Sequence, residues 1–120
     1  MEVFEKNDIV SLTNPGIVSR QLIWPTGSPN ARATITEVHV EPHAVQPRHI
    51  HEHSEQIWYA LKGTGTLLVG NDSEIAFRAG DVARFAEGDV HGLRNGDGEF
   101  IYLSVTTPPI NFERAYQAQM

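Results

Sequence analysis

The chain has 120 residues, of which 40% are hydrophobic and 20% are charged, as expected for one soluble globular domain and not for a disordered or fibrous chain. Its 9 basic and 15 acidic residues give a formal net charge of −6, which disfavours nucleic acid and anionic membranes as partners, since both attract clustered positive charge. With no cysteine, the chain has no disulfide, thiolate nucleophile or cysteine metal site, so any metal must be held by histidine and by oxygen or amide groups.

The sequence also lacks the features of a membrane or secreted protein. No apolar run approaches the roughly 18 residues of a membrane span. The first residues, Met1 to Lys6, do not have the basic and then apolar order of a signal peptide. We therefore expect a cytoplasmic protein that has no membrane partner.

In chain order, residues 1–16 are predicted to form an irregular N-terminal arm that ends in the turn Asn14-Pro15-Gly16. Residues 17–120 are predicted to form a single domain, because no linker, repeat or low-complexity tract interrupts them.

Within that domain the composition favours strands over helices, because Val and Ile number 19 against 7 Leu, and 10 Gly and 7 Pro supply turns. Strands are expected at 18–24, 33–40, 48–51, 55–62, 65–69, 74–77, 82–85, 91–95 and 100–106. A helix is expected only at 111–119, after the pair Pro108-Pro109. Many short strands between turn signals predict an all-β sandwich or barrel.

Five of the six histidines lie between residues 39 and 53, and the sixth is His91. Side chains alternate along a strand, so His49 and His51 are expected to project to the same side, with their Cα atoms about 7 Å apart. Two such imidazoles can bind one ion. Further ligands must come from other strands, where Glu55, Gln56 and His91 are the candidates.

The first histidine segment resembles a motif of the cupin family. His49-x-His51 is followed by four residues, then Gln56, six further residues and Gly63, which is the spacing of the first cupin motif. Two positions depart from it, because His43 stands where the motif begins with Gly and Gln56 stands in place of Glu.

The segment around His91 resembles the second cupin motif. Gly80, Gly88, His91 and Asn95 have the spacing of that motif, with Ala86 in place of its Pro. One H-x-H pair is a weak signal, whereas two motifs in order and with correct internal spacing are a strong one.

The resemblance covers roughly residues 33–116 and implies a double-stranded β-helix, a jelly-roll barrel, with a short C-terminal helix. It further implies one divalent metal ion inside the barrel, with Zn, Ni, Fe, Mn and Co as possible identities. Carried over by position, its ligands are His49, His51, Gln56 and His91.

Glu55 competes with Gln56 for the fourth ligand position, because adjacent strand residues point to opposite faces and only one can reach the ion. Charge favours Glu55, since a carboxylate binds a divalent ion better than an amide. Spacing favours Gln56, because six residues separate it from Gly63, as six separate the carboxylate of the motif from its glycine. We choose Gln56, because nothing between it and Gly63 signals a bulge.

The substrate pocket is expected to be bordered by Trp58, His53, Tyr102 and Arg84. Trp58 shares the strand parity of Gln56, and Arg84 is a candidate anion binder. The same parity puts Ile57, Tyr59 and Leu61 on the outer face, where a second subunit would cover them, so a homodimer is expected. The alternative is that these three residues pack the core and that Trp58 is partly exposed.

The sequence is compatible with two main functions, because cupins include enzymes and binding proteins. The first is a metal-dependent enzyme that uses the ion as a Lewis acid on a small carbonyl, carboxylate or sugar-derived compound, of isomerase, lyase or dioxygenase type. The second is a small-molecule-binding or sensing protein without turnover, which the lack of an identifiable general base favours. A structural protein with an empty site is a third, weaker possibility.

Overall fold

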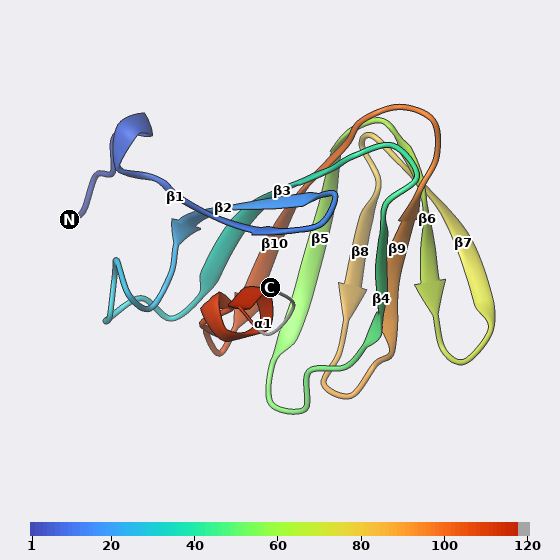
Figure 1. Cartoon of the computed structure of the whole chain (residues 1–120). Helices are drawn as coiled ribbons and strands as arrows, with labels where there is room; N and C mark the ends of the chain where they lie inside the picture. The colour runs from blue at the N-terminus through green and yellow to red at the C-terminus, as the bar shows by residue number, and fades with distance from the viewer. Residues whose placement is uncertain (118–120) are drawn as a thin grey trace.

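The computed structural model describes residues 1–117 and consists of two antiparallel β-sheets that face each other (Figure 1). The elements are η1 (Lys6–Asp8), β1 (Val10–Asn14), β2 (Ile17–Ile23), β3 (Thr34–Val40), β4 (Val45–His49), β5 (Glu55–Lys62), β6 (Thr64–Val69), β7 (Ser73–Arg78), β8 (Val82–Phe85), β9 (His91–Asn95), β10 (Phe100–Thr107) and α1 (Glu113–Gln117). The six-stranded sheet has the order β1-β2-β3-β10-β5-β8, and the four-stranded sheet has the order β4-β9-β6-β7. The predicted all-β fold is therefore confirmed.

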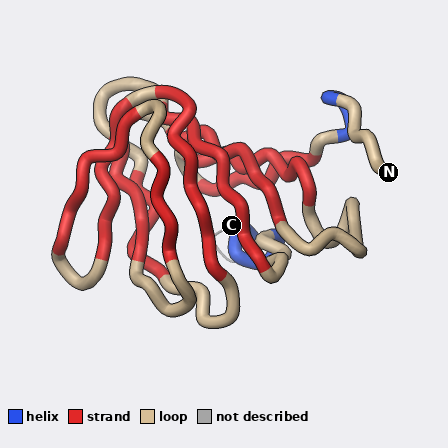
Figure 2. Tube along the Cα trace, turned by 180° about the vertical axis from the view of Figure 1, so that it is seen from behind, coloured by secondary structure: helices blue, strands red, loops and turns tan. Residues whose placement is uncertain are grey.

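From residue 17 onward, a strand overlaps each one expected, and β5, β8 and β9 have the predicted bounds. The strand expected at 48–51 is shifted, because β4 spans Val45–His49. The arm predicted to be irregular contains β1, which pairs with β2 through residues 10–14 (Figure 2). This edge strand was missed because its side chains are exposed or half-buried and show no clear apolar alternation. The C-terminal helix is confirmed over Glu113–Gln117, whereas residues 118–119 lie outside the described part of the chain. No helix within residues 1–117 is long and apolar enough to cross a membrane.

The core lies between the two sheets, and β5 shows how the sequence places it there. Gln56, Trp58 and Ala60 are 4%, 1% and 1% exposed, whereas Tyr59 and Leu61 are 43% and 42% exposed. This period of two is that of a strand with one buried face. The predicted inward direction of Trp58 is confirmed, and the alternative of a partly exposed Trp58 is excluded.

The outer face of β5 continues onto β8, where Val82 is opposite Tyr59 and is 63% exposed. Together with Leu61 these side chains form an exposed apolar strip on the six-stranded sheet. Exposed apolar strips of this kind occur at subunit interfaces. A homodimer built through this face stays a prediction.

His43 occupies a backbone conformation that explains one departure from the first motif. Its φ is +64°, in the left-handed region that glycine adopts without cost and other residues rarely adopt. The exposed imidazole lies 3.2 Å from the carboxylate of Asp97, on the surface. The position therefore has the geometry of the motif glycine, although a histidine occupies it.

Asn95, at the end of β9, links the β3–β4 connection to the β9–β10 loop at one end of the barrel. Its buried side-chain Nδ2 lies 3.1, 3.0 and 2.7 Å from the carbonyl oxygens of Val40, Glu41 and Gly98, which share its two hydrogens. Its Oδ1 accepts a hydrogen bond of 2.8 Å from the N–H of Gly96. Removing this one side chain leaves several backbone groups without a partner.

Replacement of Asn95 by Ala is therefore expected to lower the free energy of unfolding by about 2–3 kcal/mol, the cost of leaving buried polar groups unpaired. Urea denaturation followed by tryptophan fluorescence measures this loss. Asn71→Ala, at an exposed turn position, is the control and should change stability by less than about 0.5 kcal/mol. Equal stability of the two variants would contradict the role given to Asn95.

Candidate metal centre

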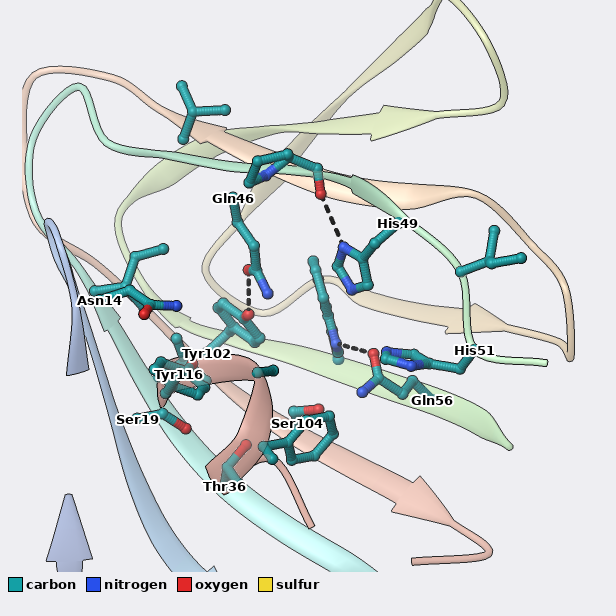
Figure 3. A pocket seen from close by; sticks show the side chains of 18 of the residues that line it. Asn14, Ser19, Thr36, Gln46, His49, His51, Gln56, Tyr102, Ser104 and Tyr116 are labelled. Carbon is teal, nitrogen blue, oxygen red and sulfur yellow. Dashed lines mark hydrogen bonds between the residues drawn. The ribbon is translucent and has the colours of Figure 1, made fainter. Parts of the chain in front are cut away.

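Three histidine side chains from two neighbouring strands and one loop converge inside the barrel. His49 ends β4, His91 begins β9, and His51 lies in the loop after β4. The potential ligand atoms of all three lie within 4.8 Å of one another. Figure 3 shows His49 and His51 on the same side of a cavity, with Gln56 next to His51. The three histidines could hold a metal ion.

The pairing of β4 with β9 brings two of these histidines together, because His49 and His91 are direct partners in the ladder. The register shifts between Gln46 and His49, and Gly92 permits the close approach of the two strands there. A Cβ atom at Gly92 would lie 2.6 Å from the carbonyl oxygen of Gln46, so only glycine fits this position without a backbone shift.

His51 reaches the site differently from the prediction. The sequence placed it on one strand with His49, but β4 ends at His49. The carbonyl oxygen of His51 accepts a hydrogen bond of 2.9 Å from the N–H of Gly88. The loop between β8 and β9, which carries Gly88, thus holds the loop between β4 and β5, which carries His51, in place.

The hydrogen bonds of the imidazole rings determine which ring nitrogens face the centre. The Nδ1 atoms of His49 and His91 lie 2.8 and 2.9 Å from the carbonyl oxygens of Pro47 and Asp89. A carbonyl oxygen can only accept, so each Nδ1 carries the hydrogen and each Nε2 of the neutral ring has a free lone pair. The Nε2 atom of His51 is buried and has no hydrogen-bond partner within the described residues.

These rings are neutral near pH 7. Burial, with a smaller contribution from the neighbouring His49, lowers the pKa of both His51 and His91 to about 4. Burial also lowers the pKa of His49, although its hydrogen bond to Pro47 acts in the opposite direction. Neutral imidazole is the form that binds a metal ion, so the protein environment favours the binding form over the protonated one.

Gln56 is fixed by three neighbours. Its Oε1 atom accepts a hydrogen bond of 3.1 Å from Nε1–H of Trp58, and its Nε2 donates one of 2.9 Å to Oγ1 of Thr106. The same Oε1 atom lies 3.0 Å from Nε2 of His91. Because the indole nitrogen can only donate, Trp58 sets the orientation of the amide and directs its oxygen toward His91.

This arrangement brings two lone pairs together, since neither Nε2 of neutral His91 nor Oε1 of Gln56 carries a hydrogen. A proton on His91 would relieve the conflict, but the pKa of about 4 opposes it near pH 7. Two atoms bound to one ion at about 2.1 Å each are about 3 Å apart when they subtend a right angle. The 3.0 Å separation, together with the unpaired Nε2 of His51, therefore fits a shared divalent cation.

Glu55 points away from this centre. Its carboxylate accepts a hydrogen bond of 2.7 Å from Nε of Arg84 on the outer face of the six-stranded sheet. Arg84 is opposite Ile57 in the ladder, which places it on the face of Glu55 and Ile57 and not on that of Gln56. The structure therefore corrects the prediction that Arg84 borders the pocket.

A cavity of about 530 Å³ opens beside the histidines. Trp58 and Tyr102 line it, as expected from the sequence, whereas His53 is exposed and is not among the lining residues. The polar residues that line it are Asn14, Ser19, Thr36, Gln46, His49, His51, Gln56, Tyr102, Ser104 and Tyr116 (Figure 3).

Sequence reasoning missed Ser19, Thr36, Gln46 and Tyr116 as cavity residues. For Ser19 and Thr36 the available signal was the alternation in β2 and β3, where polar and apolar residues share the buried face. Reading that signal requires knowing which face of the strand is inside.

Comparison with known proteins identifies the fold of this chain. Residues 36–106 match the family described as Cupin domain. No curated protein matches the sequence.

Solved structures resemble the whole barrel. KdgF from Halomonas sp. superposes with a TM-score of 0.77 at 17% identity over 91% of this chain and 96% of its own. A predicted oxalate decarboxylase from Thermotoga maritima has a TM-score of 0.75 at 22% identity, over 89% of this chain and 99% of its own. A sugar phosphate isomerase from Silicibacter pomeroyi, from a cupin superfamily, has a TM-score of 0.68 at 25% identity, over 78% of this chain and 60% of its own.

The lowered histidine pKa values predict that the metal-free protein loses stability in acid. The pKa of His91 is about 4 in the folded state, whereas in the unfolded chain it has its usual value of 6.5. Between pH 6.5 and 4 the unfolded chain therefore binds more protons than the folded one. Stability should therefore fall as the pH decreases from 7 to 5, by about 2 kcal/mol for His91 alone. Urea denaturation in the presence of a chelator measures it, and His91→Asn should show a flatter pH dependence. The same pH dependence in both proteins would contradict this account.

Proposed function

This chain belongs to the cupin family, and from that premise we propose that it binds one divalent metal ion through His49, His51, Gln56 and His91 and acts on a small carbonyl or carboxylate compound. One observation carries the proposal. The potential ligand atoms of His49, His51 and His91 lie within 4.8 Å of one another, and the amide oxygen of Gln56 lies 3.0 Å from Nε2 of His91. Within the described residues, the buried Nε2 of His51 has no hydrogen-bond partner.

The ligand set determines the electrostatics of the site. All four side chains are neutral, so a bound ion keeps its full double charge inside a barrel of low dielectric. The usual carboxylate of the motif would neutralise part of that charge. When bound, such an ion supplies a Lewis acid that polarises a carbonyl or carboxylate oxygen.

The residues of the chain position the ligand and keep its surroundings neutral. Nδ1–H of His49 is held by Pro47, and the His91 ring stacks on Phe85 with centroids 4.3 Å apart and planes at 8°. Tyr102 donates its phenol hydrogen to Oε1 of Gln46 at 2.6 Å, and burial raises its pKa well above the ordinary value. Tyr102 therefore keeps its proton and acts as a hydrogen-bonding group and not as a base.

A binding protein without turnover is the second candidate function. No Asp, Glu or Lys side chain lines the cavity within residues 1–117, so the chain supplies no carboxylate or amine as a general base there. An enzyme built on this site would need the proton to be moved by water or by a substrate group. A substrate screen on metal-loaded protein separates the two candidates. Turnover that disappears in His51→Ala supports the enzyme, and tight ligand binding without turnover supports the binding protein.

The Gln56 position gives the first test of the metal site. Gln56→Ala should weaken metal affinity about ten-fold or more, and Gln56→Glu should tighten it because a carboxylate adds charge. Glu55→Ala is the matched control and should change affinity less than about two-fold, since Glu55 pairs with Arg84 outside the barrel. Isothermal titration with Ni²⁺ and Zn²⁺ measures each constant. An effect of Glu55→Ala as large as that of Gln56→Ala would refute the ligand assignment.

Trp58 gives a second test, because its N–H selects the amide atom that faces the ion. Trp58→Phe should weaken metal affinity about ten-fold in the chain that has Gln56, since the amide can then turn its nitrogen inward. In the Gln56→Glu background the same change should cost less than about two-fold, because both carboxylate atoms are oxygens. A purely packing role of Trp58 predicts equal losses in the two backgrounds, and that result would contradict the positioning role.

A further inference from the structure

One wall of the cavity is built of small hydroxyl side chains. Ser19, Thr36 and Ser104 lie on three neighbouring strands, β2, β3 and β10, and are 2%, 3% and 4% exposed. Thr36 is the ladder partner of Ser104 and, on its other side, of Gln21. Figure 3 shows Ser19 and Thr36 across the cavity from His49. The hydroxyls therefore form a second polar group of residues, separate from the histidines.

Two of these hydroxyls are available to a ligand, whereas Ser19 already has two side-chain partners. Ser19 Oγ accepts a hydrogen bond of 3.0 Å from Nε2 of Gln21, and the same hydroxyl makes a side-chain hydrogen bond with Tyr116. Thr36 and Ser104 line the cavity, and no side-chain hydrogen bond engages their hydroxyls within the described part of the chain. Because a hydroxyl both donates and accepts, a wall of hydroxyls suits a ligand that itself carries hydroxyl groups.

The cavity has no side chain that could neutralise a second anionic group. Its lining includes no Lys or Arg among residues 1–117. Instead Arg20, Arg84 and Arg94 are held in ion pairs with carboxylates outside the cavity. An unpaired charge inside a barrel is strongly disfavoured. A ligand in this cavity can therefore place one anionic or carbonyl end at the metal position, but a phosphate at its other end would have no partner.

We infer that the ligand is a hydroxylated carboxylate or carbonyl compound of sugar size that carries no phosphate, with its hydroxyls on Thr36 and Ser104. This inference rests on the proposed metal-binding function, which supplies the partner for the carboxylate. The volume of about 530 Å³ lies within the usual range for small-molecule sites. Trp58 and Tyr102, with ring centroids 4.4 Å apart, give the cavity an apolar surface for the carbon chain.

Three six-carbon probes test this inference on Ni²⁺-loaded protein by isothermal titration. Gluconate has a carboxylate and hydroxyls, hexanoate has the carboxylate alone, and 6-phosphogluconate adds a phosphate to gluconate. Gluconate is expected to bind at least ten-fold more tightly than either of the others. Tighter binding of hexanoate or 6-phosphogluconate, equal binding of all three, or binding of none would overturn the inference.

Variants then locate the hydroxyl contacts. Thr36→Val combined with Ser104→Ala should remove most of the preference for gluconate over hexanoate, with hexanoate as the internal reference. Thr66→Val, on β6 and outside the cavity lining, is the control and should keep the preference. An unchanged preference in the double variant would contradict the assignment.

Metal content, measured on the same samples before and after titration, distinguishes failure of the proposed metal-binding function from failure of the inferred ligand class. A protein that takes up no metal refutes the proposed function. A protein that takes up one equivalent of metal but does not discriminate among the probes refutes only the ligand class.

Discussion

The contact between Nε2 of His91 and Oε1 of Gln56 is the interaction on which the rest of the site depends. The two atoms lie 3.0 Å apart, and both are hydrogen-bond acceptors. A neighbour that can only donate or only accept fixes the orientation of each group. The carbonyl of Asp89 fixes the hydrogen on Nδ1 of His91, and the indole N–H of Trp58 fixes the oxygen of Gln56. A cation resolves this conflict, and the same cation would pair with the buried Nε2 of His51.

The spacing of the two motifs and the period of two in β5 predicted much of this site. The resemblance to the cupin motifs implied that His49 and His91 meet, which the pairing of β4 with β9 agrees with. The period of two separated the inward Gln56 from the outward Glu55, because alternation along a strand is a local property. They did not predict that His51 lies off the strand, because the register shift in β4 depends on how Gly92 packs against it. They also misplaced Arg84, since its face depends on the long-range pairing of β8 with β5.

Ion pairs hold several arginines on the outside of the barrel, and this leaves its cavity with neutral and histidine side chains. Exposed ion pairs such as Arg94 with Glu74 contribute little to stability, because water and salt screen them. They nevertheless keep the arginines at the surface, and the cavity is left with neutral polar groups on one side and histidines on the other. In such a cavity a metal ion would be the main source of electric field. As the proposed fourth ligand, the neutral Gln56 would leave the full charge of that ion to act on a bound compound.

In the proposed site, Nε2 atoms of the three histidines bind one ion together with Gln56. Nitrogen-15 NMR of the histidine rings, recorded without metal and after addition of one equivalent of Zn²⁺, tests it directly. We expect His49 and His91 to carry their hydrogen on Nδ1 in both states, and the Nε2 resonances of His49, His51 and His91 all to shift on addition of Zn²⁺. Nε2 resonances that do not change with Zn²⁺, or a hydrogen found on Nε2 of His91 in the metal-free protein, would contradict it.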